Sequence, residues 1–455
     1  MVKLARTFSQ FQPFRVLVIG DFMLDAYTTG RVKRISPEAP VPVMEVIKQE
    51  SRPGGAGNVV LNLAVLGGSV IAVGRIGSDS EGAELKRRLI ESGADTQGVR
   101  IEENYRTPIK NRLISDSQQL LRVDHETIGP VNPILEQQII EDLQILIPKV
   151  QVVALSDYGK GFLTNRLISA AIQIAKEREI PVIVDPKGVD FTKYKGASVL
   201  KPNLSEAFAA AKMPPSAPLE RIAKEIFAHS SAERLLITRS EAGMSLFYPD
   251  GKRSDFPVRS KEVKDVTGAG DTVLAMICLG IANGLDLEIA VQLSNIAAGI
   301  SIEKLGCVQV TLSELAQRLL EIDSETKVFD EGHLYALHQI LKEKTYSLLI
   351  LQKGQEMTSS LFRTIRNIVN RKKGELIVYV RDSDPSDEFI HLLSSLQEVN
   401  YIILQTASLK NLYETIHPCD VYLLEGDQQI HLSQGKELID SLIKMPIGSL
   451  SNPCN

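Results

Sequence analysis

A glycine-rich turn followed by an acid is the strongest chemical pattern in the chain. Gly268, Ala269 and Gly270 precede Asp271 and a helix-like apolar segment at 273–284. Glycines placed just before a helix leave successive backbone N–H groups free to converge on one anion, and the helix dipole adds positive potential there. Asp271 would fall in the first turn, where it can accept a proton from a hydroxyl that attacks the bound anion. A turn with an ordinary helix cap explains the same letters, so both interpretations stay open.

Two further patterns place polar groups near turns. Asp21 and Asp25 follow the first strongly β-like segment, where two carboxylates can hydrogen-bond a polyhydroxylated ligand. Gly54 and Gly55 permit close backbone approach before a helix, and Asn58 offers a donor and an acceptor to a sugar hydroxyl. A solvated strand end and a plain tight turn explain these two patterns equally well when each is taken alone.

A third pattern, Asn203-Leu-Ser-Glu206, follows a short β-like segment. An asparagine with a glutamate three positions later is typical of a capping box at the start of a helix. The functional alternative is that Glu206 positions a magnesium-bound water near a triphosphate. Both interpretations stay open on this pattern alone.

The elements that must position these residues alternate between short β-rich segments and helices. This alternation predicts an α/β fold, with a mostly parallel sheet covered by helices. Because most of the polar residues above follow β segments, we expect them at the carboxyl edge of that sheet. The expected strands are 15–21, 70–77, 151–157, 180–186, 198–203 and 234–240, and the first expected helices are 57–66 and 80–91.

Two segments interrupt the alternation, and a polar stretch divides it. Residues 41–48 and 107–124 resemble exposed antiparallel strands without intervening helices, which predicts a small β lid or a dimer surface. The polar stretch at 322–327 separates a helical segment from a new series of alternating helices and strands. We therefore predict a first domain at 1–322 and a second, smaller α/β domain at 323–455.

Composition excludes several classes of protein. The chain has 455 residues and a formal net charge of -5, so we expect a folded protein without a nucleic-acid partner. The four cysteines form no CxxC pair, which argues against a zinc ribbon or a disulfide framework. No signal-like or membrane-spanning segment is apparent, so we expect a cytoplasmic protein without a membrane partner. Only His125 and His229 precede residue 327, so the first domain must use carboxylates, lysines and backbone amides.

In this order, and on this α/β background, the patterns resemble those of the ribokinase-like (PfkB) carbohydrate kinases. The resemblance implies that Asp271 is the catalytic base and that Gly268, Ala269 and Gly270 form the anion hole. It implies that the sugar is held by Asp21, Asp25, Gly54, Gly55 and Asn58. It also implies that ATP and Mg²⁺ are required, with Asn203 and Glu206 acting near the magnesium ion and Glu206 as its contact.

The segments between these motifs narrow the resemblance to one branch of the family. That branch is the D-glycero-β-D-manno-heptose-7-phosphate kinases, often the first domain of a bifunctional heptose kinase/adenylyltransferase. The resemblance covers about residues 10–320 and implies phosphorylation of the anomeric hydroxyl, for ADP-heptose and lipopolysaccharide core synthesis. The segments are 35–43, 52–59, 156–161, 185–188, 201–206 and 238–246.

A substrate that already carries a phosphate needs cationic contacts. The candidates are Lys110, Arg112, Arg122, Lys160 and Lys187, for each of which a solvated surface role is at least as compatible. On the nucleotide side, analogy with the family assigns Thr238, Gly243, Asn295 and Lys304, which helix capping and surface charge also explain. Lid strands in this family often pair between subunits, so the resemblance further implies a homodimer formed through them.

The second domain resembles the nucleotidyltransferase-like domain of the bifunctional relatives, but it lacks their HxGH motif. The corresponding letters are Asp330-Glu331-Gly332-His333, where an acid replaces the first histidine and would repel a nucleotide phosphate. The serine/threonine-rich phosphate-binding segment of the relatives is not recognisable at 444–455. We therefore expect a folded remnant without adenylyltransferase activity. The alternatives are a fully bifunctional enzyme and, more remotely, a non-catalytic sugar-nucleotide binding or scaffold protein.

Overall fold

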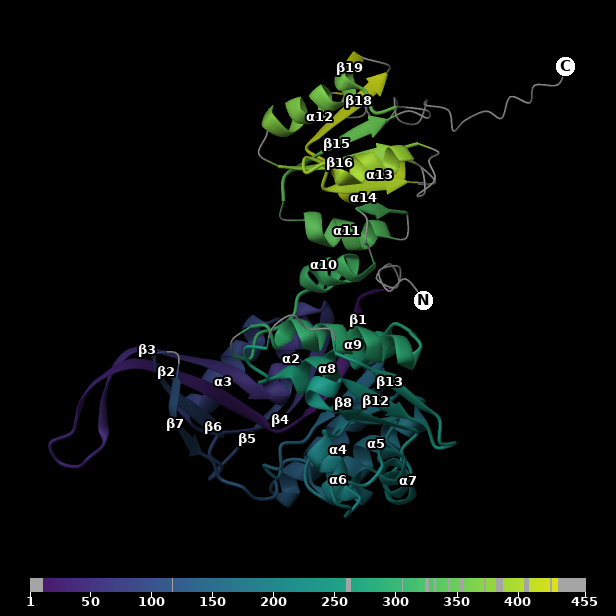
Figure 1. Cartoon of the computed structure of the whole chain (residues 1–455). Coiled ribbons are helices and arrows are strands. Elements are labelled where there is room, and N and C mark those ends of the chain that lie inside the picture. The colour runs from purple at the N-terminus through teal and green to yellow at the C-terminus, as the bar shows by residue number, and fades with distance from the viewer. Residues whose placement is uncertain are drawn as a thin grey trace. The chain divides into compact units, whose positions relative to one another are not determined.

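The structure is a computed structural model of the whole chain (Figure 1), and it divides into two compact units. The first unit comprises Gln12–Thr311, and the second includes the chain from Leu312 onward. No helix among the described residues is long and apolar enough to cross a membrane. The structure describes residues 11–432 except 117, 259–262, 305, 324–326, 331–332, 343, 352–355, 372–373, 382–387, 405–408 and 426–427.

A nine-stranded sheet forms the centre of the first unit. Its order is β13-β12-β11-β10-β9-β8-β1-β4-β5, and its pairs are parallel except for β11–β12 and β12–β13. Its strands are β1 (Phe14–Gly20), β4 (Gly68–Gly77), β5 (Asp95–Glu102), β8 (Val152–Ser156), β9 (Val182–Asp185), β10 (Val199–Leu200), β11 (Arg234–Thr238), β12 (Met244–Phe247) and β13 (Arg253–Phe256). The predicted α/β architecture is confirmed.

Helices cover both faces of this sheet (Figure 1). Val16, Leu17, Val18 and Ile19 in β1 are all fully buried, as a parallel strand with two covered faces requires. Leu17 and Ile19 join a core cluster with α4, α5 and α7, and α2 and α8 also pack against β1. The helices are α2 (Ala56–Val65), α3 (Ser80–Glu91), α4 (Pro133–Leu146), α5 (Asn165–Glu177), α6 (Leu204–Ala210), α7 (Leu219–Ser230), α8 (Ala269–Ala282) and α9 (Leu287–Ser301).

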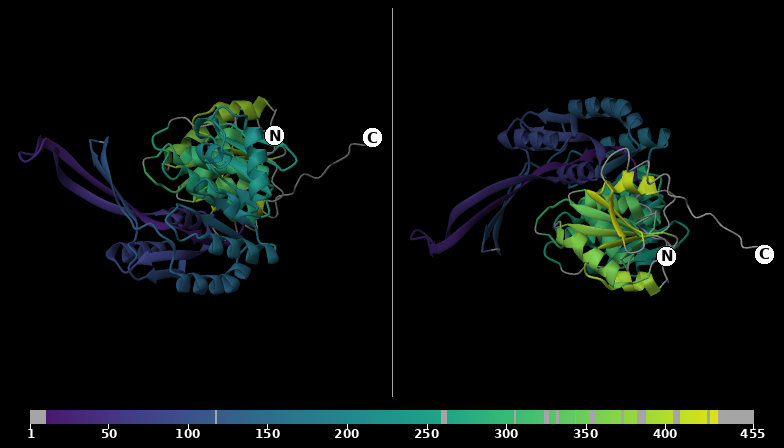
Figure 2. Two further views of the ribbon diagram at one scale, coloured as in Figure 1. Left: turned by 90° about the horizontal axis from the view of Figure 1, so that it is seen from below. Right: turned by 90° about the horizontal axis from the view of Figure 1, so that it is seen from above.

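A second, four-stranded sheet extends from the large sheet of the first unit (Figure 2). Its order is β3-β2-β6-β7, formed by β2 (Phe22–Ile35), β3 (Pro42–Gly55), β6 (Ile109–Ser115) and β7 (Gln118–His125). The two predicted lid segments are confirmed as strands. The sequence did not predict β2 in this sheet, nor that β2 and β6 pair in parallel.

The second unit has a sheet of its own, with the order β14-β17-β16-β15-β18-β19. Its inner strands are almost completely buried on both faces, as in the first unit. Its elements are α10 (Leu312–Asp323), β14 (Val328–Phe329), α11 (Leu334–Leu341), β15 (Tyr346–Leu351), α12 (Ser359–Arg371), β16 (Glu375–Val380), α13 (Glu388–Ser395), β17 (Tyr401–Leu404), α14 (Leu409–Ile416), β18 (Asp420–Glu425) and β19 (Gln428–Leu432). These elements match the predicted helix–strand alternation.

The division between the units falls before α10, whereas the sequence places the domain boundary after residue 322. In the structure α10 packs against α11, within the second unit. The predicted boundary at 322 and the division of the structure before α10 thus differ by one helix. Residues 324–326 of the polar stretch and the final segment 444–455 lie outside the described residues.

Candidate functional site

The start of helix α8 lies beside the carboxyl ends of the central strands. Gly268 is its N-terminal cap with a φ of +80°, a left-handed conformation that favours glycine. A Cβ on Gly268 would also lie 2.8 Å from Nδ2 of Asn58, so a side chain would collide with that amide. The local sequence thus fixes a turn with small side chains at the helix start, in which the N–H of Ala269 donates to the backbone oxygen of Val266 at 3.3 Å.

Asp271 occupies the first turn of α8, and only 3% of its surface is exposed. Asn58 Nδ2 donates to Oδ2 at 2.7 Å, and the Tyr158 hydroxyl donates to Oδ1 at 2.7 Å. Burial raises the pKa of Asp271 to about 7, although both donors oppose the shift. A carboxylate with a pKa near neutrality is suited to act as a general base.

Asn58 is itself held by its neighbours. Its Oδ1 accepts from Gln309 Nε2 at 3.1 Å, and Asn62 Nδ2 donates to its backbone oxygen at 2.9 Å. The sequence predicted that Asn58 binds a sugar hydroxyl. The structure brings it to Asp271, where one of its two amide hydrogens is used to hold the carboxylate.

Lys201 is a buried cation that the sequence analysis did not single out. Its side chain is 3% exposed, and its Nζ lies 3.0 Å from Oδ2 of Asp185 at the end of β9. A Cβ on Gly270 would lie 3.6 Å from this Nζ, so the ammonium group lies next to the glycine turn. The available signal was the motif KPNLSE, in which the lysine directly follows strand β10.

Asp21 holds a loop rather than an open strand end. Its carboxylate accepts backbone N–H groups from Tyr158 at 2.9 Å, Lys160 at 3.0 Å and Phe162 at 3.2 Å. Arg75 donates to the backbone oxygen of Lys160 at 2.9 Å from the other side. Both carboxylate oxygens of Asp21 thus accept hydrogen bonds from this loop. The sugar-binding role of Asp21 stays a prediction.

Asp25 lies at the base of the small sheet. Arg112 Nη1 pairs with Oδ1 of Asp25 at 2.6 Å, and the side chain of Asp25 is almost fully buried. A Cβ on Gly54 would lie 2.1 Å from Oδ2 of Asp25, which explains why position 54 carries no side chain. Gly55 caps α2 with a φ of +58°. The structure thus brings these four predicted residues together.

The remaining predicted cations separate into two groups. Lys110 is half-buried, and its pKa is lowered by burial and by the charges of Lys160 and Arg122, whereas Asp25 and Asp124 oppose the shift. Within the described residues Lys110 has no ion-pair partner, whereas Lys160 pairs with Glu126 and Arg122 pairs with Asp124 at 2.9 Å. Lys187 lies elsewhere and is described with the next group.

Asn203 and Glu206 form a complete capping box at the start of α6. Asn203 Oδ1 accepts the N–H of Glu206 at 2.9 Å, and Glu206 Oε2 accepts the N–H of Asn203 at 3.0 Å. Lys187 Nζ pairs with Glu206 Oε1 at 2.7 Å. The structural interpretation of this pattern is therefore present. The role of Glu206 near magnesium stays a prediction. Among the described residues no three His, Cys, Asp or Glu side chains cluster as a metal site.

Three of the four predicted nucleotide residues lie near the end of β13. Gly243 has a φ of +84°, and a Cβ there would lie 1.9 Å from the oxygen of Phe256. Asn295 Nδ2 donates to that oxygen at 3.3 Å, and Thr238 pairs with Met244 next to Gly243. Lys304, by contrast, donates to the backbone oxygen of Gln309 at 3.3 Å.

The second unit presents a different site. In its sheet the strands β15, β16 and β17 follow one another outward, and the chain then crosses back to β18 on the other side of β15. Ligands bind doubly wound sheets where the order reverses, here at the carboxyl ends of β15 and β18. Asp330 and His333 instead follow the edge strand β14. The correspondence of residues 330–333 with the HxGH motif of the relatives stays a prediction, and residues 331–332 lie outside the described residues.

His333 is a buried helix-start residue. It is 3% exposed, and its Nδ1 lies 2.8 Å from Oδ1 of Asp330. Its ring packs edge-on against Phe329, with 5.6 Å between the ring centroids. These contacts explain its presence by packing and by the local contact with Asp330.

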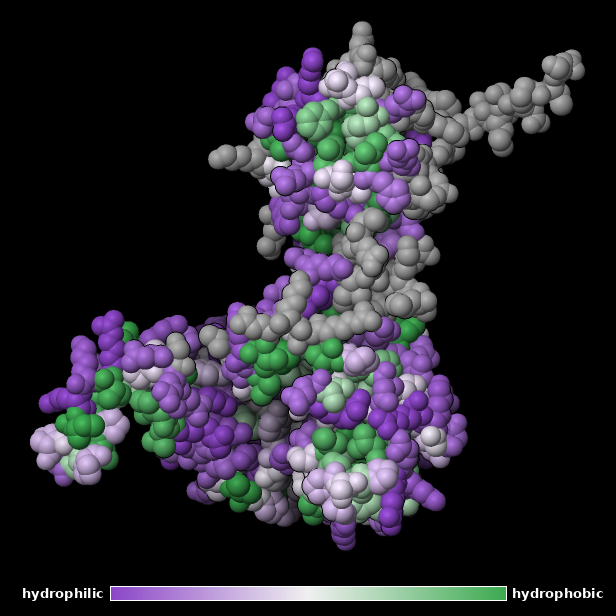
Figure 3. Space-filling view, in the orientation of Figure 1, coloured by the Kyte–Doolittle hydropathy of each residue, from purple (hydrophilic) through white to green (hydrophobic). Residues whose placement is uncertain are grey.

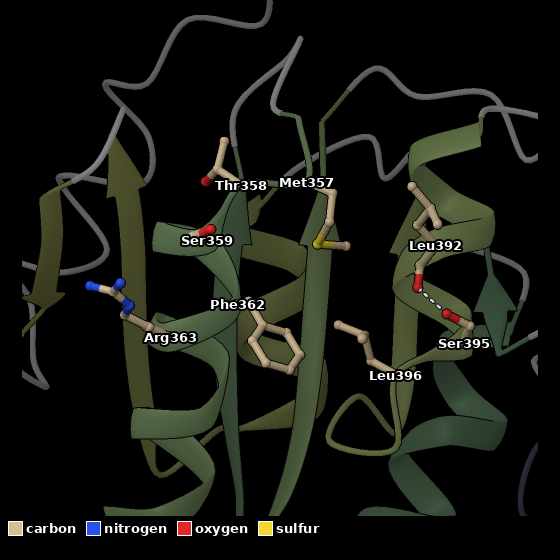
Figure 4. Close-up of a pocket in the computed structure, with 8 residues that line it drawn as sticks. All are labelled: Met357, Thr358, Ser359, Phe362, Arg363, Leu392, Ser395 and Leu396. Atoms are coloured by element: carbon tan, nitrogen blue, oxygen red, sulfur yellow. Dashed lines mark hydrogen bonds between the residues drawn. The ribbon is translucent and has the colours of Figure 1, made fainter.

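A cavity of about 490 Å³ lies between α12 and α13 (Figure 4). Phe362 and Leu396 point toward one another across it, and Thr358 and Ser359 lie at its upper rim. Arg363 is the only charged side chain among its described lining residues. The cavity thus offers neither a carboxylate nor an imidazole for chemistry on a nucleotide. Its lining is Met357, Thr358, Ser359, Phe362, Arg363, Leu392, Ser395 and Leu396.

Comparison with known proteins gives a consistent pattern. The model of the family "pfkB family carbohydrate kinase" matches residues 14–314. Among curated relatives, "Bifunctional protein HldE" of Trichlorobacter lovleyi is 38% identical over 95% of this chain and 92% of the relative. The protein of the same name from Citrifermentans bemidjiense is also 38% identical, over 95% of this chain and 93% of the relative.

Solved structures resemble the first unit. Arabidopsis thaliana ribokinase, complexed with ribose and ATP, has a TM-score of 0.55 at 19% identity and covers 68% of this chain and 99% of its own. Escherichia coli phosphofructokinase-2 with fructose-6-phosphate has a TM-score of 0.55 at 19% identity, over 68% of this chain and 100% of its own. At this identity the likeness shows a shared fold.

Proposed function

The chain belongs to the pfkB family of carbohydrate kinases, and we propose that it transfers the γ-phosphoryl group of ATP to D-glycero-β-D-manno-heptose 7-phosphate. The acceptor is the anomeric hydroxyl, and the product is heptose 1,7-bisphosphate. We place this reaction in ADP-heptose synthesis for the lipopolysaccharide core. The proposal rests on full-length similarity to the bifunctional relatives and on the matching motifs.

One observation carries the proposed reaction. Asp271 is buried at the start of α8, directly after the Gly268–Gly270 turn, and donors from two other elements hold both of its oxygens. The backbone amides of the turn would hold the migrating phosphoryl group, while Asp271 takes the proton of the attacking hydroxyl. Lys201 lies next to the turn and would offset negative charge that develops there. Positioning and charge then supply the catalysis without a covalent intermediate.

The substrate phosphate requires a cationic contact, and Lys110 is the best-placed candidate. It is half-buried and has no ion-pair partner among the described residues. Its Nζ lies 5.7 Å from the centroid of the ring of Tyr158, whose hydroxyl donates to Asp271. Lys160 and Arg122 add positive charge near it. Arg112 is less available, because Asp25 already pairs with it.

ATP and Mg²⁺ would approach from the side of α6. Glu206 offers a carboxylate there, one oxygen of which would have to exchange Lys187 or the N–H of Asn203 for the ion's water shell. A magnesium ion that keeps several waters and binds the phosphates needs only one or two protein carboxylates. The ion supplies charge neutralisation on the phosphates when it is bound. We propose Glu206 as its contact, with Asn203, Thr238, Gly243, Asn295 and Lys304 around the nucleotide.

We propose that the second unit does not transfer adenylyl groups. No histidine follows β15 or lines the cavity in the described part of this unit. A fully bifunctional enzyme is the alternative, favoured by relatives whose printed name is bifunctional and that match 95% of this chain. Incubation of the protein with heptose 1-phosphate and ATP decides between them. Release of pyrophosphate with formation of ADP-heptose would contradict the proposal.

The small sheet also supports a proposal about assembly. Its strands expose apolar side chains, including Ile35, Ile47 and Leu121, and apolar surface is visible at the free end of the β2–β3 hairpin (Figure 3). We propose that two copies pair through these strands. Light scattering should give the mass of a dimer for the wild type and of a monomer for Ile47→Lys with Leu121→Lys. A monomeric wild type would contradict this proposal.

A substrate panel tests the kinase activity. ADP release should be fastest with heptose 7-phosphate and much slower with unphosphorylated heptose, ribose or fructose 6-phosphate. The same panel with Asp271→Asn reports the background rate. Faster turnover of another sugar would retain a kinase but overturn the proposed substrate.

A further inference from the structure

Tyr158 contacts the base through a single, well-defined hydrogen bond. Its hydroxyl lies 2.7 Å from Oδ1 of Asp271, while Asn58 takes Oδ2 at the same distance. Each carboxylate oxygen therefore has one strong donor, and the donors come from different elements. Two donors on a carboxylate fix its plane and favour its charged form.

The backbone around Tyr158 is held as firmly as its hydroxyl. Asp21 accepts the N–H of Tyr158 and two further N–H groups of the same loop, and Arg75 binds the oxygen of Lys160. Asp21 and Arg75 are 2% and 3% exposed, so water does not compete for these contacts. The loop thus presents Tyr158 to Asp271 in one orientation.

The Tyr158 hydroxyl keeps its proton at neutral pH. Burial raises its pKa well above the ordinary value, and the nearby charges of Asp271 and Asp185 act in the same direction. It therefore serves as a donor to the carboxylate and does not compete with it as a base. The other groups that face Asp271 are Asp185, Lys201, Asn58 and Cys307.

We propose that Tyr158 is a positioning residue that keeps Asp271 ionised and oriented for the proton transfer. This role rests on the proposed kinase reaction and assigns a function to a hydroxyl that the sequence analysis did not single out within the segment 156–161. The hydroxyl donates throughout the cycle, and Asp271 alone gains and loses the proton of the acceptor. Its loss reduces the fraction of enzyme that carries an active base.

Tyr158→Phe removes only the hydroxyl. The pKa of Asp271 should then rise by about one unit, because one of the two donors that oppose the effect of burial is lost. The acid limb of the kcat profile should move upward by the same amount, so activity falls about fivefold at pH 7 and recovers near pH 9. The KM for ATP should not change.

Tyr248→Phe provides a matched control. The hydroxyl of Tyr248 also donates to a carboxylate, that of Glu288 in the first turn of α9, at 3.0 Å. This variant should keep the wild-type pH profile. If Tyr158→Phe lowers kcat by one factor at every pH, or leaves the profile unchanged, the positioning role is overturned.

A second measurement does not depend on activity. Calorimetry of the wild type, Tyr158→Phe, Asp271→Asn and the double variant at pH 8.5 gives the change in the free energy of unfolding for each protein. The unfolding transition that Asp271→Asn shifts belongs to the first unit, and the four values from it give the coupling between the two side chains. The proposal predicts a non-additive cycle whose coupling weakens at pH 5, where Asp271 is protonated. Additive effects at pH 8.5 would overturn it. A coupled cycle in a protein that phosphorylates no sugar would instead contradict the proposed function and leave the contact standing.

Discussion

The two units use related layered architectures, but they differ in the chemistry that their described residues bring together. In the first unit Asp157, Asp185 and Lys201 follow β8, β9 and β10, and Asp271 begins the helix beside them. In the second unit the residues directly after β15, β17 and β18 lie outside the described residues, and the described cavity between α12 and α13 has one charged lining residue, Arg363. The cores are equally well buried in both. A conserved architecture is therefore separable from the chemistry at its edge.

The comparison also separates two uses of an acid beside a glycine. Asp271 is buried, accepts two side-chain donors and has a pKa raised to about 7. Asp330 contacts the neighbouring imidazole of His333 at a helix start, beside an edge strand. An acid near a glycine is thus a candidate base in one unit and a partner of a neighbouring imidazole in the other.

Asp271→Asn should produce the largest effect. Loss of the general base should lower kcat about 10³-fold, while the protein stays folded because the amide keeps the shape of the side chain. Stopped assays of ADP release measure the change. The matched variant Asp330→Asn in the second unit should leave kinase activity unchanged, and equal losses in both variants would remove the contrast between the units.

Lys201→Met should follow, with a loss of about 10²-fold in kcat and little change in the KM for the sugar. The physical reason is loss of the positive charge next to Gly270. Because Asp185 then stays buried without its partner, the double variant with Asp185→Asn controls for misfolding. Lys344→Met removes an ion pair with Glu375 in the second unit and should be silent. Full activity in the double variant would contradict the role of Lys201.

The change of kcat with pH should be smaller near neutrality than the losses in the two variants above, but its shape identifies the titrating base. Asp271 has a pKa of about 7, and only its ionised form accepts a proton. The value of kcat should therefore fall about tenfold for each pH unit below 7 and level off above 8. Rate measurements from pH 5.5 to 9 suffice. A rate that is constant down to pH 5 would show that Asp271 is not the titrating base.

Lys110→Ala should have the smallest effect. The KM for the phosphorylated sugar should rise about tenfold, while kcat changes little, because a charge-assisted contact to the substrate phosphate is lost. Lys252→Ala, which removes an exposed ion pair with Glu288, is the control. An equal rise in KM for an unphosphorylated sugar would show that Lys110 does not recognise the phosphate.

Much of the fold could be predicted because the core is built from local, repeated patterns. Buried strands such as β1 and β15 are continuous apolar segments, and amphipathic helices between them leave little ambiguity. The long strand β2 was missed because it begins only two residues after β1 and continues into a polar segment without regular alternation. Its pairing with β6 joins segments more than 80 residues apart, which no local pattern reveals.

The site was only partly predictable for the same reason. The spacing of the glycines predicts the Gly268–Asp271 turn. Tyr158 contacts Asp271 and Lys201 lies next to Gly270, but these contacts join distant parts of the sequence and no local pattern reveals them. Asp21 was read as a ligand because acids at strand ends suit sugars, but in the structure it holds three backbone amides. In the second unit, the sequence did not predict that β14 lies at the edge of the sheet beside β17, away from β15.

Phosphorus NMR of the product formed from heptose 7-phosphate and ATP tests the central claim most directly. We expect the wild type to give ADP and a new resonance of a phosphate on the anomeric carbon, with the 7-phosphate retained. Asp271→Asn should give neither within the same time. A phosphate on another carbon, or an undiminished product signal from Asp271→Asn, would contradict the account of this site.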